Sequence, residues 1–289
     1  GAVQFLILKG SDHPLAATYA AVGDGTSIPE QTFEQFRSFC LDHRDELVTI
    51  LESRRVQTNE VGRCALLYPA FTLLASRVTR PLAIIEIGPS AGLNLNWHRF
   101  GYDYRGVSTC GDPDSPVKIS TEVRGDHTPP IIATPDPPAL SIGIDYSPID
   151  VANEEDALWL RALVWPDQKA RGERLRAAID ITRKHPVKLI EGDGVARTDE
   201  IIGEIAEEYF PCVFHTHALY QFPDDLRRLK EIVARHAESR DIAHLALEWG
   251  GGVGSHLNLV TYRENTSTEE LLAVGHAHGK WIEWQGGSS

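Results

Sequence analysis

The first residues that could carry chemistry lie in the stretch LAIIEIGPSAGLNL, residues 82–95. An apolar run interrupted by Glu86 leads into a turn that contains Gly88, Ser90 and Gly92. A buried parallel strand reads as a continuous apolar run, and glycine lets the backbone adopt positive φ angles and approach a ligand closely. A helix that starts after such a turn offers unpaired N–H groups to polar ligand groups. The stretch therefore predicts a strand, a glycine loop and a helix start that suit a nucleotide-like ligand.

The glycine spacing separates this loop from one well-known class of sites. The dinucleotide-binding fingerprint requires Gly-x-Gly-x-x-Gly, whereas the glycines here stand at positions 88 and 92. Glycine-rich turns between strand and helix also occur in doubly wound α/β proteins for structural reasons alone. The loop by itself therefore supports a cofactor site and a structural turn equally.

Two further predicted strands end in acidic residues. The run LSIGID ends at Asp145, and a short strand at residues 187–190 leads into Gly192 and Asp193. Because the carboxyl ends of parallel strands form the ligand-binding edge of an open α/β sheet, the glycine loop and the two acids form a coherent set. The structural alternative is that both acids form turns or cap helices, as Asp commonly does.

Two His-x-His pairs, at residues 215–217 and 276–278, suggest a different chemistry. Residues i and i+2 of a strand face the same side, so two such pairs could bind a transition metal through nitrogen. That arrangement predicts a metal-dependent hydrolase or oxygenase. Alternatively, one of His215 and His217 fills the core and the other acts as a general base beside Tyr220, since histidine titrates near neutral pH.

Composition narrows the class of protein. The formal charge of −13 over 289 residues argues against a general nucleic-acid binder, because such proteins collect Lys and Arg to neutralise phosphates. No apolar run approaches the ~18 residues of a membrane span, and no signal-peptide pattern opens the chain. We expect a cytoplasmic protein that acts on a small-molecule substrate, with neither nucleic acid nor membrane as a partner.

The elements that would position these residues alternate between strand and helix up to residue 248, which predicts a parallel sheet. Expected strands span residues 82–87, 140–145, 187–190 and 242–248, with a fourth strand and its exit loop over 211–220 and an antiparallel pair over 257–262 and 271–284. Expected helices span residues 30–54, 60–77, 200–209 and 224–238, with two more over 153–184 that break near 165–166. A capping-box pattern at Ser267 and Glu270 leaves a short helix as an alternative there.

The expected elements fall into two regions. Residues 1–79 read as a helical cap, in which the segment before residue 22 is a helix, a break at Pro14 and a second helix. Residues 80–289 read as the α/β domain. A Pro-rich and Asp-rich stretch at about 105–139 reads as an insertion with a few irregular strands, because so long a connection is usually functional or inserted.

Six stretches in this order span nearly the whole chain: SDHPLAATYA, TNEVGRCALLYPA, EIGPSAGLNLNWHRFGYDY, ALWLRALVWPDQKARGERLRAAI, VFHTHALY and HAHGKWIEW. Together they resemble an uncharacterised bacterial family known only as a domain of unknown function. The loop from Glu86 to Gly92 is in addition similar to the first motif of class I S-adenosylmethionine-dependent methyltransferases, acidic-x-Gly-x-Gly-x-Gly, with Ser90 in place of the middle glycine. Pro89 stands where members of the bacterial family often have alanine, and it stiffens the loop.

The resemblance to the bacterial family supplies no reaction, but together with the methyltransferase-like motif it implies a doubly wound, mostly parallel sheet of methyltransferase-like (Rossmann-like) type, with an antiparallel C-terminal strand pair and an N-terminal helical cap. It implies S-adenosylmethionine as the cofactor, with Asp145 at the ribose hydroxyls, Asp193 near the adenine amino group, and the exit of the fourth strand at the substrate and methyl donor. The cofactor-binding residues would be Glu86, Gly88, Ser90, Gly92, Asp145, Gly192 and Asp193, and the catalytic residues His215, His217 and Tyr220.

Three functions follow as hypotheses. The protein could bind S-adenosylmethionine and methylate a small molecule held under the helical cap. It could instead be a histidine-metal hydrolase that uses the same cleft. It could also be a binding or scaffolding protein that kept the fold and lost the chemistry, since fold does not imply function.

Overall fold

The computed structural model describes residues 1–19, 29–252, 254–264 and 266–286. Contacts divide the chain into two compact units: residues 1–59 with 149–183, and residues 60–148 with 184–289. These boundaries differ from the expected division at residue 79, because the helix at 64–77 packs with the sheet and the helices at 154–183 pack with the N-terminal helices.

The first unit is helical. It contains α1 (Ala2–Leu8), a 3-10 helix (Pro14–Thr18), α2 (Pro29–Asp42), α3 (Arg44–Ser53), α5 (Glu154–Ala162) and α6 (Lys169–Lys184). The single helix expected over 30–54 is two helices, because the chain breaks at His43, and the helix expected after Pro14 is a short 3-10 turn. Part of that expected helix, residues 20 and 21, lies outside the described residues. The expected break near 165–166 does separate α5 from α6.

Trp159 anchors the core of this unit. Its ring meets Phe5 edge-on with centroids 5.8 Å apart, and its indole N–H donates to the carbonyl of Arg55 at 2.7 Å. Because Phe5 lies on α1 and Trp159 on α5, two segments more than a hundred residues apart in the sequence share one apolar core. This packing explains why the unit is discontinuous in the sequence.

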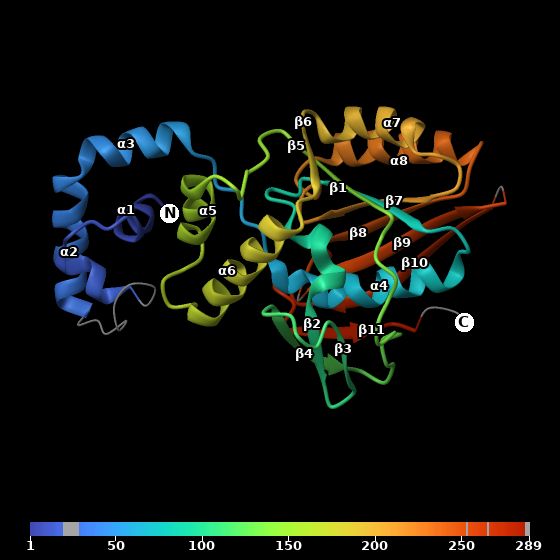
Figure 1. Cartoon of the computed structure of the whole chain (residues 1–289), viewed down its shortest axis with the longest axis horizontal. Coiled ribbons are helices and arrows are strands. Elements are labelled where there is room, and N and C mark those ends of the chain that lie inside the picture. The colour runs from blue at the N-terminus through green and yellow to red at the C-terminus, as the bar shows by residue number, and fades with distance from the viewer. Residues whose placement is uncertain (20–28, 253, 265, 287–289) are drawn as a thin grey trace. The chain divides into compact units, whose positions relative to one another are not determined.

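The second unit is built on one mixed sheet (Figure 1). Its strands are β1 (Leu82–Ile87), β2 (Gly101–Arg105), β3 (Ser108–Gly111), β4 (Lys118–Arg124), β5 (Leu140–Asp145), β6 (Lys188–Glu191), β7 (Phe210–Thr216), β8 (Ile242–Trp249), β9 (Ser255–Arg263), β10 (Thr266–Gly275) and β11 (Trp281–Trp284). Within the described residues the strand order is β3-β2-β4-β11-β10-β9-β8-β7-β1-β5-β6. Strands β6, β5, β1, β7 and β8 are mutually parallel. Strands β9 and β10 continue the sheet as an antiparallel pair.

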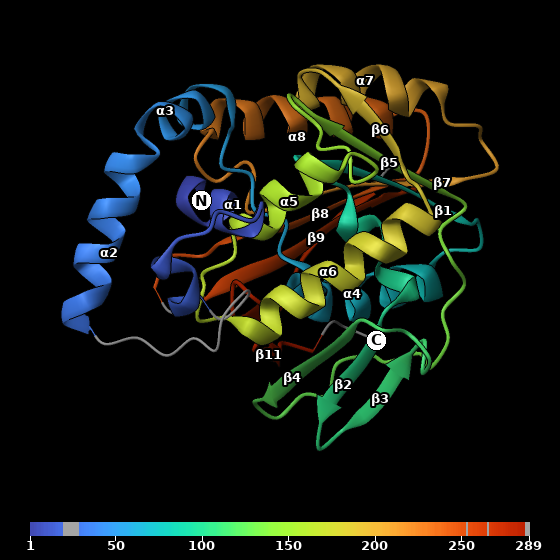
Figure 2. The same cartoon turned by 60° about the vertical axis from the view of Figure 1, so that its left-hand side comes forward.

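Helices cover both faces of the parallel part of the sheet. Helices α7 (Gly194–Glu204) and α8 (Pro223–Ala237) lie on one face and α4 (Cys64–Arg77) lies on the other, as both views show (Figures 1 and 2). Ile85, Ile87 and Val213 share an apolar cluster with residues of α7 and α8. Since successive side chains of a strand alternate between faces, Glu86 points to the opposite face, toward α4. No helix among the described residues has the length and apolar character that a bilayer crossing requires.

Several expected elements need correction. Helix α7 begins at Gly194 instead of residue 200, because Asp193 caps it. The C-terminal region contains three strands instead of two, and the segment with the capping-box pattern belongs to β10. The insertion expected at 105–139 contributes ordered strands that begin at Gly101 and join the main sheet through the pairing of β4 with β11.

Candidate functional site

Three loops meet where β1, β5 and β6 reach their carboxyl ends. The backbone N–H of Ser90 donates to Oδ2 of Asp145 at 2.9 Å, and the N–H of Gly192 donates to the Asp145 carbonyl at 2.9 Å. The N–H of Gly88 donates to the carbonyl of Ile144, also at 2.9 Å. The glycine loop and the acidic strand ends that the sequence groups together are therefore neighbours in space.

The backbone of the glycine loop is left-handed at three positions. Gly88, Ser90 and Gly92 have φ angles of 70°, 57° and 70°. A Cβ on Gly92 would lie 2.7 Å from Cγ2 of Val187, and a Cβ on Gly88 would lie 2.9 Å from Cβ of Ala218. Both glycines are therefore required by backbone angle and by close neighbours, whether or not a ligand binds.

The segment after the loop departs from the expected α-helix start. Gly92 precedes a 3-10 helix, Leu93–Arg99, whose φ and ψ angles are interrupted at Asn96. Short 3-10 helices commonly serve as connectors. The row of aligned N–H groups that a long α-helix would offer at this loop is replaced by a tight turn.

The Asp145 carboxylate closes the loop. Its Oδ2 accepts the Ser90 N–H, and its Oδ1 accepts the N–H of Ser147 at 2.9 Å. The side chain is buried. The structural role weighed for this residue, a turn former, is therefore observed, and its carboxylate also lies at the edge where a ligand is expected.

Asp193 and Tyr146 form the neighbouring part of the edge. Oδ1 of Asp193 accepts the N–H groups of Val195 at 2.9 Å and Ala196 at 3.0 Å, which caps α7. These bonds, that from Ala196 foremost, lower the pKa of Asp193, and a hydrogen bond from the Tyr146 hydroxyl lowers it further. Tyr146 follows Asp145 directly, and its ring is 61 % exposed. An open aromatic face therefore lies between the two acids.

Glu86 is a buried carboxyl group behind the glycine loop. Burial raises its pKa to about 8, the Asn94 side chain and the Arg63 charge oppose that rise, and the Asp145 charge adds to it. Within the described residues, neither Oε2 of Glu86 nor Nδ2 of Asn94 has a hydrogen-bond partner of good geometry. Buried polar atoms without a partner are rare in native proteins. They mark this position as one where a ligand or an ordered water would complete the bonding.

Arg63 connects this position to the exit of β7. Its guanidinium donates from Nη1 to the Thr216 carbonyl at 3.1 Å and from Nε to the Ala277 carbonyl at 3.2 Å. Gly62 and Gly279 pack against each other so closely that a Cβ on Gly279 would lie 1.8 Å from the Gly62 carbonyl oxygen. The turn before α4 and the turn between β10 and β11 are thus fixed against each other beside the strand ends.

His215 is held in the core. Its Nδ1 lies 2.5 Å from Oε1 of Glu248 and its Nε2 lies 3.0 Å from Nε2 of His244. Glu248 also accepts the N–H groups of Ala218 and Leu219, each at 3.0 Å. Although burial alone would raise the pKa of Glu248, these bonds hold it below its ordinary value. Both ring nitrogens of His215 are engaged, and the His215–Glu248 pair fixes the loop that leaves β7.

His217 lies past the end of β7 with a φ angle of 52°, so it does not alternate with His215 as two strand residues would. Its Nε2 lies 2.8 Å from Oγ of Ser255, and its ring is 6.1 Å from that of Tyr220. Burial and the Arg63 charge lower the pKa of His217 to about 4. The imidazole is therefore neutral at pH 7, with a lone pair on one ring nitrogen, although the lowered pKa makes it a weaker base than an exposed histidine.

The second histidine pair is arranged differently again. Nδ1 of His276 accepts the backbone N–H of His278 at 3.0 Å, and Nδ1 of His278 lies 4.0 Å from Oε2 of Glu60. Among the described residues, no three His, Cys, Asp or Glu side chains are grouped so that they could hold a metal ion. In the described part of the chain, the two His-x-His pairs are therefore not brought together as such a group.

Sequence reasoning about the site omitted Arg63, Asn94, Glu248 and Ser255. Arg63 and Asn94 do lie inside stretches that resemble the bacterial family, TNEVGRCALLYPA and EIGPSAGLNLNWHRFGYDY. No local spacing pointed to Glu248 or Ser255, because they reach the site only through the pairing of β8 and β9 with the rest of the sheet.

Comparison with known proteins places the chain in a family without assigning a reaction. No curated protein and no solved structure matches it. Residues 1–284 match the family described as an uncharacterized protein conserved in bacteria (DUF2332). Because the match covers nearly the whole chain, the protein belongs to this family.

Proposed function

We propose that the second unit binds S-adenosylmethionine at the carboxyl ends of β1, β5 and β6 and transfers its methyl group to a small molecule. The observation that carries the proposal is the strand order. Numbered along the chain, the parallel strands β6-β5-β1-β7-β8 run 3-2-1-4-5, the order of a doubly wound sheet. Such sheets bind ligands outside the carboxyl ends of their strands, where the order reverses, and the glycine loop follows β1 at that point.

The residues present suit such a cofactor. Glu86, whose Oε2 is buried without a partner in the described part of the chain, would accept the ammonium group of the methionine moiety. Asp145 would accept the ribose hydroxyls, and the exposed ring of Tyr146, next to Asp193, would stack on the adenine. When bound, S-adenosylmethionine supplies an electrophilic methyl group on a positively charged sulfur.

The acceptor would meet the residues at the exit of β7. His217, neutral at pH 7 because of its lowered pKa, would take a proton from the acceptor, and Tyr220 would contact it. His215, with both ring nitrogens engaged, would act as a positioning residue that holds Glu248 and the exit loop in place.

Calorimetric titration with S-adenosylmethionine and S-adenosylhomocysteine tests the proposal. We expect both to bind, and Tyr146→Ala to weaken binding about tenfold or more, because stacking of a base on an aromatic ring contributes about 1–3 kcal/mol. The matched control is Phe222→Ala, which removes another exposed aromatic ring that follows β7 and should leave affinity unchanged.

Absence of binding by an intact, folded sample would reject the proposal. Equal losses in Tyr146→Ala and Phe222→Ala would reject the assigned adenine position. Binding without methyl transfer to any of a panel of nucleophilic small molecules would leave the ligand site in place and favour a binding protein over an enzyme.

A further inference from the structure

The first unit contains a cavity of about 290 Å³. Its lining comes from α1, from the end of α5, from the connection between α5 and α6, and from the first half of α6, so it is formed entirely within this unit. The volume is close to the lower end of small-molecule sites, roughly 300–1,000 Å³. Its residues have no part in the adenosyl site proposed for the second unit.

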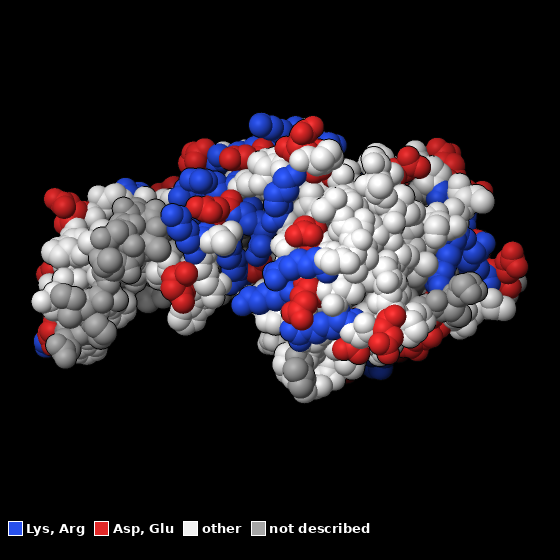
Figure 3. All heavy atoms as spheres, turned by 90° about the horizontal axis from the view of Figure 1, so that it is seen from below, with Lys and Arg blue, Asp and Glu red and all other residues white. Residues whose placement is uncertain are grey.

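Cations dominate the charged lining. Arg161, Lys169 and Arg176 line the cavity, against a single acidic side chain, Glu173. Among the described residues, no carboxylate lies within 4.0 Å of any of these three cations. Figure 3 shows Lys and Arg side chains gathered on the face seen from below, over the part of the chain that carries α6. Such a concentration is unexpected in a chain with a formal charge of −13.

The cations repel one another in the absence of an anion. Burial lowers the pKa of Arg161, and the charge of Arg176 lowers it further, while Asp180 and Glu154 oppose the shift. Arg161 is partly buried near the C-terminal end of α5. A bound anion would offset the repulsion and stabilise the charged form of Arg161.

Gly172 is the lining position without a side chain. It lies within α6, where glycine is less favourable than alanine. A Cβ at this position would meet no atom within 4 Å, so no neighbouring protein group explains the missing side chain. Gly172 lines the cavity, and its bare backbone leaves room there. The open space beside Gly172 lets a ligand approach the backbone of α6 closely.

Leu8, Val164, Trp165 and Pro166 form the apolar part of the lining, and Gln4 and Gln168 add uncharged polar groups. Trp165 is 70 % exposed. An exposed tryptophan beside cationic groups suits a ligand that is anionic at one end and apolar or aromatic at the other.

We propose that this cavity binds a small organic phosphomonoester, with the phosphate held by Arg161, Lys169 and Arg176 and the organic group against Trp165. Three cations and Glu173 leave a net charge of +2, and a phosphomonoester carries about −1.5 to −2 at neutral pH. Arg binds phosphate through two parallel hydrogen bonds. A carboxylate can accept the same two bonds, but it carries less negative charge than a phosphomonoester.

Titration calorimetry on the full chain with phenyl phosphate, inorganic phosphate and benzoate tests the ligand class. We expect phenyl phosphate to bind at least about tenfold more tightly than either fragment, because it alone supplies both the dianion and the apolar group. Equal affinity for phenyl phosphate and inorganic phosphate would show that the cavity binds an adventitious ion only and does not recognise the organic group. Tighter binding of benzoate would overturn the phosphate assignment, and no binding of any probe would overturn the site.

Charge variants locate the site. Lys169→Gln and Arg176→Gln should each weaken phenyl phosphate binding about tenfold. Lys230→Gln removes the same charge from exposed α8 in the second unit and should change affinity less than twofold, roughly the effect of one distant screened charge. Equal effects of Lys169→Gln and Lys230→Gln would show that the overall charge, not the cavity, attracts the anion.

Gly172→Ala separates loss of binding from loss of fold. It should raise the thermal unfolding midpoint slightly, since alanine favours a helix, and it should reduce phenyl phosphate affinity because the added methyl group fills part of the cavity. The control is Gly203→Ala, at the other glycine within a described helix whose Cβ would meet no atom within 4 Å. Retained affinity in Gly172→Ala would overturn the inferred ligand position.

Discussion

Glu86 occupies a position where its charged form is unfavourable. Glu86 is 1 % exposed, and burial raises its pKa to about 8 from an ordinary value of 4.5. A carboxyl whose pKa is raised on folding stabilises the native state fully below pH 4.5, and that stability is lost as the pH rises toward 8 and beyond. The Glu86 carboxyl is therefore mostly protonated at pH 7, and a cation beside Oε2 would favour its charged form.

Replacing Glu86 by glutamine should remove this pH dependence. As the pH rises from 5 to 8, the free energy of unfolding of the unmodified protein should fall by about 3 kcal/mol relative to that of Glu86→Gln. This figure follows from about 1.36 kcal/mol per pKa unit. Urea unfolding at several pH values measures the difference. Glu204→Gln, at an exposed position at the end of α7, is the control and should leave the pH dependence as it is. A difference independent of pH would show that Glu86 is not protonated near neutrality.

The candidate site residues that the sequence could predict are those at strand ends. Asp145 ends β5 and Asp193 lies just beyond β6, so the parallel arrangement alone brings them to one edge. The surroundings of His215 could not be predicted, because His244 and Glu248 come from a neighbouring strand in a register that only the folded sheet fixes. Arg63 likewise reaches the site through the turn before α4, which no periodicity connects to β7.

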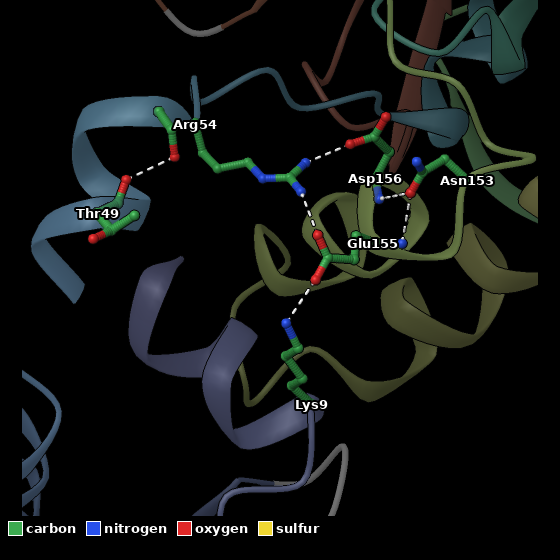
Figure 4. Close-up of polar contacts among 7 residues, drawn as sticks. Lys9, Thr49, Arg54, Asn153, Glu155 and Asp156 are labelled. Carbon is green, nitrogen blue, oxygen red and sulfur yellow. Dashed lines mark hydrogen bonds and ion pairs between the residues drawn. The ribbon is translucent and has the colours of Figure 1, made fainter. Parts of the chain in front are cut away.

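At the scale of elements, one side chain organises the start of α5. Oδ1 of Asn153 accepts the N–H groups of Glu155 at 2.9 Å and Asp156 at 3.2 Å. Arg54 bonds to both of those acidic side chains, and Lys9 bonds to Glu155 at 2.6 Å (Figure 4). The cap therefore orients the two carboxylates that connect α5 to the ends of α1 and α3.

Asn153→Ala should lower the free energy of unfolding by about 1 kcal/mol, because the first turn of α5 loses its cap. Asn153→Asp keeps an oxygen acceptor and adds a negative charge at the helix N-terminus, so it should retain the stability. Chemical denaturation of both variants makes the comparison. If Asn153→Ala is as stable as Asn153→Asp, the cap makes no net contribution to the free energy of unfolding, because water satisfies the same N–H groups.

Element types were predictable where a long pattern decides them. The apolar run of β1 and the amphipathic pattern of α8 sit close to their expected positions. The predicted boundaries were wrong where a single capping or turn residue decides them. Because Asp193 caps α7, this helix begins six residues earlier than expected, and the helix expected over 30–54 is interrupted at His43. The α-helix expected after Gly92 is a 3-10 helix for the same reason, because hydrophobic periodicity does not report a left-handed glycine at its start.

At the scale of the whole chain, the two proposed sites lie in different units. The second unit carries the glycine loop and the acidic strand ends of a mostly parallel sheet, and the first carries a cavity lined by three cations in a chain of negative net charge. The expected helical cap at residues 1–79 has other boundaries than the first unit. The reason is that Trp159, in the segment 149–183, packs against the N-terminal helices, which are far away in the sequence. Sequence patterns report local structure, whereas this boundary depends on long-range packing.

Hydrogen exchange on the full chain should separate the two proposed sites. A ligand that binds only the folded state stabilises it by about 2.7 kcal/mol at a hundred times its dissociation constant, and exchange slows most where local opening releases the ligand. S-adenosylhomocysteine should therefore slow exchange at residues 88–92, 145–147 and 192–196, and phenyl phosphate should slow it in α6 and at residues 163–168. Protection of the glycine loop by phenyl phosphate, with none in α6, would show that the phosphate uses the strand-end site and that the basic cavity is not a ligand site.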